Sequence, residues 1–260
     1  MYFDAGPRLS SLAMTKDGRP SRINDIRLFV GERPGHRYVE GQEEAVAFGR
    51  RIAYFLNGEG FSLGAYPALY VLFTRSLEPG EVRVTDFGGD WWQRYTDVGV
   101  AQGFLNDRDA YQTIANGIVA ALKAVRPDLE SMINEAAETV RTYGDEFRFL
   151  VRSRETKHFV VEVSFVLSVS PKPSLLYVSL TDRSTGAFLE APPIEMPIYF
   201  EAFGLASSIR VNTNRVELSP GKSIFAALSS LRHGGPIGAD LTEFVPCKRP
   251  RFSKLVKPRA

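Results

Sequence analysis

The stretch from residue 128 to residue 169, DLESMINEAAETVRTYGDEFRFLVRSRETKHFVVEVSFVLSV, decides the fold class because its hydrophobic period changes once. Up to Tyr143, apolar residues recur every three or four positions, which is typical of an amphipathic helix. After Gly144 they alternate with polar residues, as at Val161, Val163 and Phe165, which is typical of antiparallel strands. The stretch therefore predicts a helix that leads directly into a β-rich region.

Similar patterns lie on both sides of this stretch. Residues 69–73 and 82–84 are β-prone runs around the turn signal Pro79-Gly80, and they predict a hairpin. Further helices are predicted at residues 42–56, 109–125 and 222–231, and further strands at 26–30, 175–181 and 198–203. Helices and strands without regular βαβ alternation favour an α+β fold, with a largely antiparallel sheet packed with about four helices.

The chain has 260 residues and is 44% hydrophobic, which is enough for the core of one large domain or two small ones. We expect an irregular N-terminal arm at 1–25 and an α+β domain at 26–247, in which two lobes could meet near 126–146. Residues 248–260 carry six cations and no acid. Because the whole chain has a net charge of +2, residues 1–247 have a net charge of −4. This basic segment has little apolar surface, and we expect a poorly ordered C-terminal tail outside the functional site.

Cellular location can be inferred from three features. Cys247 is a lone cysteine and has no intramolecular disulfide partner, and residues 1–7 have neither the basic nor the apolar region of a signal peptide. The apolar runs are too short or too interrupted to cross a bilayer. We therefore expect a cytoplasmic protein without membrane insertion.

Three motifs suggest chemistry, but the sequence around each motif argues against that reading. Residues 60–64 match the G-x-S-x-G pattern of serine hydrolases around Ser62, yet a predicted helix precedes them and a strand follows, the reverse of a nucleophile elbow. Residues 221–223 form Gly-Lys-Ser without the first glycine of a phosphate loop, since that position is Val216. Residues 86–88 form Asp-Phe-Gly without the other kinase motifs.

Metal and cofactor sites find no support in the residue spacing. The three histidines His36, His158 and His233 are isolated from one another and from any close Cys or carboxylate. We therefore predict no metal site and no cofactor.

Two regions are candidate partner-binding sites. The first combines tryptophan, tyrosine and arginine, which dominate binding hot spots, with two carboxylates: Asp86, Asp90, Trp91, Trp92, Arg94 and Tyr95. The second is the charged face of the helix at 128–143, with Glu130, Glu135 and Glu138, in a region (128–146) of net charge −5 that would favour a basic partner. The alternatives are a loop whose tryptophans pack on the core and a merely solvated helix face.

In its organisation the chain resembles the immunity proteins of bacterial toxin systems. The resemblance covers mainly residues 26–128: an early strand and helix, the hairpin from Tyr70 to Val84 and the helix that ends Val125-Arg126-Pro127-Asp128. It implies an antidote that binds and neutralises a cognate toxin by direct protein–protein contact. Antidotes to nucleases are often markedly acidic, and this chain is not, so the chemistry of the toxin stays open.

Two other functions stay open. One is an enzyme with an unrecognised site, for which hydrolysis through Ser62 and a distant histidine is one candidate chemistry. The other is a structural or phage-type assembly protein. Because the basic charge is confined to the C-terminal segment, nucleic-acid binding is not expected.

Overall fold

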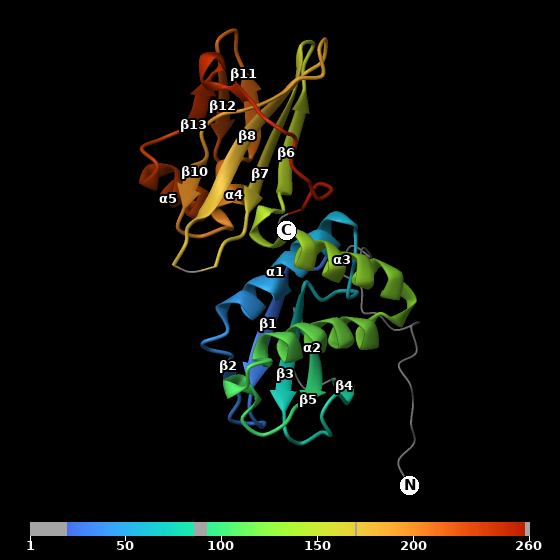
Figure 1. Ribbon diagram of the computed structural model, residues 1–260. Coiled ribbons are helices and arrows are strands. Elements are labelled where there is room, and N and C mark those ends of the chain that lie inside the picture. Colours follow the sequence, from blue (N-terminus) through green and yellow to red (C-terminus); the bar gives the residue numbers. More distant parts are fainter. Residues whose placement is uncertain (1–19, 86–92, 170, 258–260) are drawn as a thin grey trace. The chain divides into compact units, whose positions relative to one another are not determined.

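The computed structural model describes residues 20–85, 93–169 and 171–257. They form an α+β fold, as the sequence predicts, with antiparallel sheets and one mixed sheet (Figure 1). The chain divides into two compact units between Glu138 and Thr139, inside helix α3 (Glu130–Tyr143). Unit 1 precedes this point and unit 2 follows it. Among the helices that the described residues form, none has both the length and the apolar content of a membrane span.

Unit 1 is built on a five-stranded mixed sheet with the strand order β2-β1-β3-β5-β4. The three central strands β1, β3 and β5 are parallel, and the edge strands β2 and β4 are antiparallel to their neighbours. Its elements are β1 (Asp25–Val30), β2 (Arg37–Tyr38), α1 (Glu43–Gly58), β3 (Ala68–Thr74), β4 (Val82–Thr85), β5 (Gln93–Gly99), η2 (Phe104–Asn106), α2 (Ala110–Val125) and η3 (Pro127–Leu129).

Helices α1 and α2 pack against each other and against the strands (Figure 1). Gly117 of α2 makes this approach possible, because a Cβ atom there would lie 2.5 Å from the Phe73 ring and 3.2 Å from Val98. Phe73 and Val98 therefore belong to the helix-covered face of the sheet. The neighbouring residues Leu72 and Asp97 lie on the opposite face, since successive side chains of a strand alternate.

The predicted hairpin of residues 69–73 and 82–84 is wrong. Both runs form strands, but β5 lies between β3 and β4 and pairs with each of them. Strand β5 was not anticipated, because its sequence QRYTDVG lacks a run of apolar residues. Its last four residues are nevertheless buried, since a central parallel strand is covered on both faces.

In unit 2, the sheets that the described residues form are antiparallel. One has the order β14-β9-β8-β7-β6, with β10 also pairing with β8, and the other has the order β11-β12-β13. Its elements are η4 (Gly144–Glu146), β6 (Phe149–Glu155), β7 (Phe159–Val166), β8 (Ser174–Asp182), β9 (Phe188–Glu190), β10 (Ile194–Met196), α4 (Glu201–Leu205), β11 (Ser208–Val211), β12 (Arg215–Ser219), α5 (Ile224–Arg232), β13 (Ile237–Asp240), η5 (Leu241–Glu243) and β14 (Val245–Pro246).

The strand predicted at residues 198–203 is also wrong. The chain makes a turn here and then enters helix α4. The Glu201 amide, at the start of α4, donates a hydrogen bond to the Ile198 carbonyl at 3.0 Å. The aromatic residues of the segment favour strands intrinsically, but packing decides the outcome. Ala202 and Leu205 are buried, and α4 packs against α5.

The expectation of a poorly ordered basic tail is wrong for residues 248–257. After β14 has paired with β9, the segment crosses to the other edge of the sheet, where the Arg148 amide donates to the Arg251 carbonyl at 3.1 Å. The Val256 amide then donates to the Leu150 carbonyl at 2.8 Å, and the Val256 side chain is only 1% exposed. Hydrogen bonds to β6 and the burial of Val256 thus order this segment, although its composition predicts little order. Residues 248–256 are called the strap below.

Of the predicted N-terminal arm, residues 1–19 lie outside the described part of the chain. Ile23 is fully buried, and the Asn24 amide donates to the Pro67 carbonyl at 2.8 Å. The last residues before β1 therefore belong to the packed part of unit 1.

Candidate functional site

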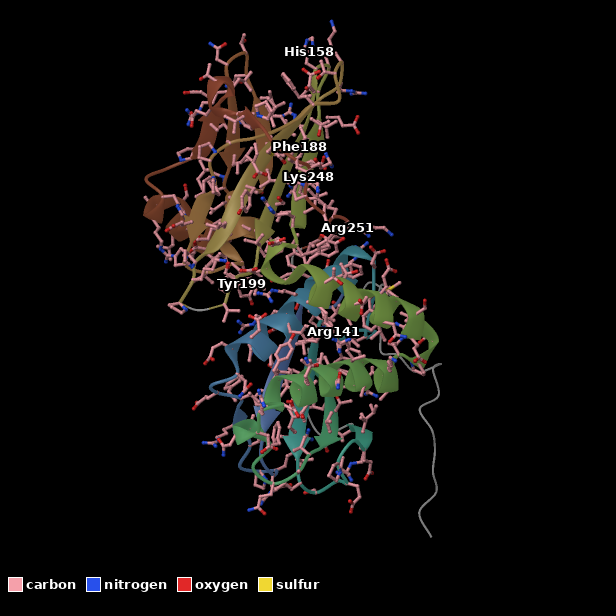
Figure 2. The ribbon with its side chains drawn as sticks, in the orientation of Figure 1. Arg141, His158, Phe188, Tyr199, Lys248 and Arg251 are labelled. Atoms are coloured by element: carbon pink, nitrogen blue, oxygen red, sulfur yellow. The ribbon has the colours of Figure 1, made fainter. Side chains whose placement is uncertain are left out.

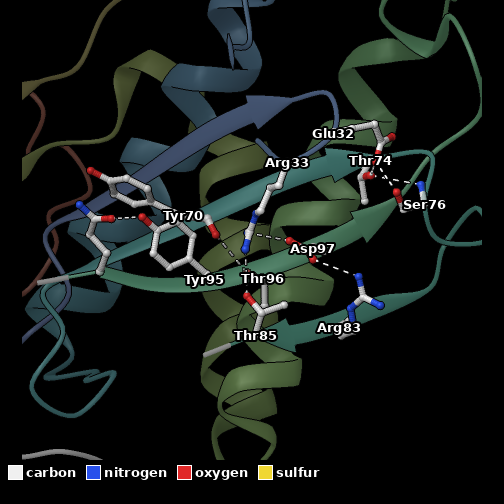
Figure 3. A network of polar contacts seen from close by, with 11 residues as sticks. Glu32, Arg33, Tyr70, Thr74, Ser76, Arg83, Thr85, Tyr95, Thr96 and Asp97 are labelled. Carbon is white, nitrogen blue, oxygen red and sulfur yellow. Dashed lines mark hydrogen bonds and ion pairs between the residues drawn. The ribbon is translucent and has the colours of Figure 1, made fainter. Parts of the chain in front are cut away.

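A buried carboxylate, Asp97 on β5, is the centre of a polar network on the sheet face of unit 1 opposite to α2 (Figure 3). One carboxylate oxygen accepts a hydrogen bond from the Arg33 guanidinium at 2.8 Å, and the other accepts one from Arg83 at 3.3 Å. Arg33 also donates to the Thr85 hydroxyl at 3.4 Å. One side chain from the loop after β1 is thus bound to both β5 and β4.

Aromatic rings lie beside this network and carry cations over their faces. Phe29, Tyr70 and Tyr95 are in ring contact across β1, β3 and β5, with centroid distances of 5.1 Å and 5.4 Å. The Arg27 guanidinium lies 5.5 Å from the centre of Tyr70, and that of Arg33 lies 5.0 Å from the centre of Tyr95. Burial raises the pKa of the Tyr70 phenol. This side of the sheet is therefore a second small core and not an open groove.

A second carboxylate, Glu32, lies where the parallel strands end. It accepts hydrogen bonds from the Thr74 hydroxyl at 2.6 Å, the Arg75 amide at 2.9 Å and the Ser76 hydroxyl (Figure 3). These donors, Ser76 first, lower the pKa of Glu32 from 4.5 to about 2. Two consecutive residues thus anchor the start of the loop after β1: Glu32 binds the end of β3, and Arg33 binds β5.

The unit 1 network is suited to holding a loop and not to acid–base catalysis. Both Asp97 oxygens already bind guanidinium groups, and Glu32 is satisfied by three donors. A general base needs an oxygen within reach of a substrate proton. Among the described residues, the exposed groups on this face include Arg83, Arg27 and Tyr38, the last being 55% exposed.

The structure separates the predicted partner-binding residues. Asp86, Asp90, Trp91 and Trp92 lie outside the described residues. Arg94 and Tyr95 are consecutive on β5, so their side chains point to opposite faces of the sheet, and Arg94 lies 5.9 Å from the Tyr66 ring while Tyr95 contacts Tyr70. On α3, the acidic residues Glu130, Glu135 and Glu138 are all exposed.

Ser62 belongs to a loop that its own hydroxyl holds together. The hydroxyl donates to the Ser21 carbonyl at 2.6 Å and accepts from the Gly64 amide at 2.9 Å. Its carbonyl accepts a hydrogen bond from Arg126. Ser62 is buried, so these contacts explain its presence without a reaction. Within the described residues, no group of three or more His, Cys, Asp or Glu side chains is placed to hold a metal.

Helix α5 of unit 2 has the reverse of the usual amphipathic arrangement. Its buried side consists of the small residues Ala226, Ser229 and Ser230. Ile224 and Leu231 lie on the outer side and are 81% and 74% exposed. With Leu228, which is 58% exposed, they follow the i, i+4, i+7 spacing that aligns side chains on one helix face. These three residues are called the α5 apolar face below.

The side chains on the inner side of α5 are small because α4 lies close to this side of the helix. A Cβ atom on Gly204 would lie 3.3 Å from the Ala226 Cα, so larger residues would not fit between the two helices. The helix start is capped by the Ser223 hydroxyl, which accepts from the Ala226 amide at 3.1 Å. The fold therefore explains which side of α5 faces inward, but it does not use the α5 apolar face.

Aromatic and cationic residues surround the α5 apolar face. Phe200 and Phe225 are in ring contact at 5.1 Å and are 40% and 37% exposed. Lys222 and Arg232 lie at the two ends of the helix, and residues 218–239 contain no carboxylate. Arg232 is paired with Glu201, but 48% of its side chain stays exposed. Sequence reasoning found this helix but missed its outward face, although the spacing of Ile224, Leu228 and Leu231 is visible in the sequence.

Comparisons with protein-family models, with curated proteins and with solved structures give no match for this chain.

Proposed function

We propose that this chain is a binding protein that contacts another protein through the α5 apolar face of unit 2. The observation that carries the proposal is the reversed arrangement of α5, with small residues inside and Ile224, Leu228 and Leu231 outside. Exposed aliphatic side chains gathered on one helix face are typical of protein interaction sites. Their spacing matches the anchors of a helix that lies in an apolar groove of its partner.

The charge around α5 defines the partner more closely. Lys222 and Arg232 flank the apolar face, and no acid lies within residues 218–239. Complementary charge at the rim of an interface speeds association and selects the partner. The partner is therefore a protein with an apolar groove that carboxylates line at its edge.

The resemblance to toxin immunity proteins supplies the specific form of this proposal. In that form the partner is a cognate bacterial toxin domain, and the chain neutralises it in the cytoplasm by direct contact. The predicted contact residues Asp86, Asp90, Trp91, Trp92, Arg94 and Tyr95, and the exposed acids Glu130, Glu135 and Glu138, would add contacts outside α5.

The experiment places a photo-cross-linking amino acid at position 228 in the full chain, inside the native cell. The same residue at position 245 serves as the matched control, because Val245 is an exposed apolar residue, 60% exposed, outside α5. We expect one protein to be cross-linked from position 228 and not from position 245. The cross-linked protein is then purified, and its affinity for the full chain is measured.

The affinity measurement uses the triple variant Ile224→Ser, Leu228→Ser, Leu231→Ser. Interface anchors each contribute about 2 kcal/mol or more, so we expect the triple variant to bind at least about tenfold more weakly. An unchanged affinity, or cross-linking of two copies of this chain, would contradict the proposal. A partner that binds as expected but is harmless when expressed alone would leave the binding role and remove the immunity role.

A further inference from the structure

A cavity of about 680 Å³ lies within unit 2, on the end of its larger sheet that the strap crosses. Its volume is in the range of small-molecule binding sites. The walls come from four parts of unit 2: the segment around η4, the end of β7, the start of β8 and the strap. Figure 2 shows Lys248 and Arg251 of the strap. The lining residues used below are Tyr143, Ser168, Lys172, Tyr177, Lys248 and Arg251.

Positive charge dominates the lining, with five Lys and Arg residues against two acids. Three of these cations already have carboxylate partners. Arg148 pairs with Glu190 at 3.2 Å, Lys172 with Asp145 at 2.7 Å, and Arg249 with Glu162 at 2.8 Å.

The two cations that remain are Lys248 and Arg251. Within the described part of the chain, neither has an ion pair. Both belong to the strap, whose backbone is fixed on either side: the Cys247 amide donates to the Phe188 carbonyl, and the Arg251 carbonyl accepts from the Arg148 amide, each at 3.1 Å. The cavity thus presents two available charges from a held backbone.

Two hydroxyl groups add uncharged donors to the same cavity. The Ser168 hydroxyl is buried and has no hydrogen-bond partner among the described residues, which is costly unless something else satisfies it. The Tyr177 ring lies under the Arg148 guanidinium, 3.0 Å from the ring centre, which fixes its position. Burial raises the pKa of the Tyr177 phenol, so its proton is present at neutral pH.

We propose that this cavity binds the phosphate ester of a small organic molecule, with Lys248, Arg251 and the hydroxyl groups of Ser168 and Tyr177 as donors to the phosphate. Several donors around two available cations suit an oxyanion with several terminal oxygens. The cavity is larger than a phosphate ion needs, and Tyr143, which is 38% exposed, offers a ring to the organic part. This ligand site is independent of the α5 apolar face.

The test is isothermal titration calorimetry on the full chain with AMP, with adenosine as the uncharged control and with inorganic phosphate. We expect AMP to bind at one site per chain, with adenosine and inorganic phosphate at least about tenfold weaker, since each lacks one half of the recognised molecule.

Variants locate the site. Lys248→Gln with Arg251→Gln is expected to weaken AMP binding at least about tenfold, because it removes both available charges. The control Lys254→Gln with Lys257→Gln lies on the same segment and removes the same charge, but neither residue lines the cavity. It should change the affinity less than about twofold. Tyr177→Phe keeps the ring under Arg148 and should weaken binding by a smaller factor.

Three outcomes would overturn the proposal. One is the absence of saturable AMP binding at millimolar concentration. Another is equal weakening by the two double variants, which would indicate a general surface-charge effect. The third is a competing ligand that binds as tightly as AMP or more tightly. This ligand could be inorganic phosphate, or a single-stranded oligonucleotide whose affinity depends steeply on salt while that of AMP does not.

Discussion

The two units of this chain differ in how fully the fold uses their charged and apolar side chains. In unit 1, Asp97 is bound by two arginines, and Glu32 is satisfied by three donors. In unit 2, Lys248 and Arg251 line a cavity without an ion pair among the described residues, and the aliphatic residues of α5 face outward.

This difference distinguishes groups that hold the fold from groups that are kept for a ligand. A charge that is buried and paired is explained by the fold, because removing its partner leaves it uncompensated. An exposed aliphatic face and an unpaired cation do not stabilise the fold on their own. We therefore assign a scaffold role to the described network of unit 1 and propose that unit 2 carries the main binding face.

The largest effect is expected at the centre of the unit 1 network. Asp97→Ala removes a carboxylate that is 7% exposed and leaves Arg33, which is 15% exposed, without its main partner. Breaking such a pair costs about 3–5 kcal/mol of unfolding free energy. Chemical denaturation measures this loss. As a control, Asp25→Ala breaks the ion pair with Arg27, whose side chain is 44% exposed, and should cost less than about 1 kcal/mol of unfolding free energy. Equal losses in the two variants would show that Asp97 stabilises the fold no more than an exposed ion pair does.

A somewhat smaller loss is expected when the strap is deleted after Cys247. The deletion removes the buried Val256 side chain and exposes the apolar surface that it covers. It also removes the hydrogen bonds between the strap and the backbone of Arg148 and Leu150. Burial of one valine contributes about 1.5–3 kcal/mol, so unit 2 should lose about 2 kcal/mol of unfolding free energy. A deletion variant with wild-type stability would show that the strap does not hold unit 2 together.

Acid should destabilise unit 1 through the protonation of Glu32. The pKa of Glu32 is lowered from 4.5 to about 2, so its contribution to stability is fully present above about pH 4.5 and is lost as the pH falls to about 2. Thr74→Ala with Ser76→Ala removes two of the three donors and should move this pKa back toward 4.5. NMR titration of the Glu32 carboxyl group measures the shift. A pKa that stays near 2 in the double variant would disprove the assigned cause.

The smallest effect on stability is expected at the α5 apolar face. Ile224→Ser, Leu228→Ser and Leu231→Ser should each change the unfolding free energy by no more than about 0.5 kcal/mol, because these side chains are exposed. Ala226→Asp is the matched contrast on the inner side of the same helix, where the side chain is 1% exposed, and it should destabilise unit 2 strongly. Thermal denaturation compares the four variants. A large loss in the outer variants would mean that α5 packs in a way that the exposure does not reveal.

Most helices and the antiparallel strands of unit 2 could be predicted from the sequence, because their hydrophobic period is strong. Helix α2 (Ala110–Val125) and strand β7 (Phe159–Val166) lie where the pattern places them. Strand β5 could not be found in this way, because Asp97 and Arg94 interrupt its apolar residues. Asp97 can be buried because Arg33 and Arg83 pair with its carboxylate. Local sequence does not show which distant side chains will neutralise a charge.

The candidate sites were harder to predict than the fold. The spacing in α5 identifies an apolar face, but only the proximity of Gly204 to Ala226 shows that this face points outward. In the strap, the composition suggested disorder because it does not show hydrogen bonds to a strand edge a hundred residues earlier in the chain, such as that from Val256 to Leu150.

The most direct test of the assignment of binding to unit 2 is the affinity of the protein partner that the wild-type chain retains in its native cell. It is measured for the α5 variant Ile224→Ser, Leu228→Ser, Leu231→Ser and for a unit 1 variant, Tyr38→Ser with Arg83→Gln, which changes the exposed groups beside the Asp97 network. If binding resides in unit 2, the α5 variant loses affinity at least about tenfold and the unit 1 variant less than about twofold, and this is the result that we expect from the assignment. A loss confined to the unit 1 variant would contradict it.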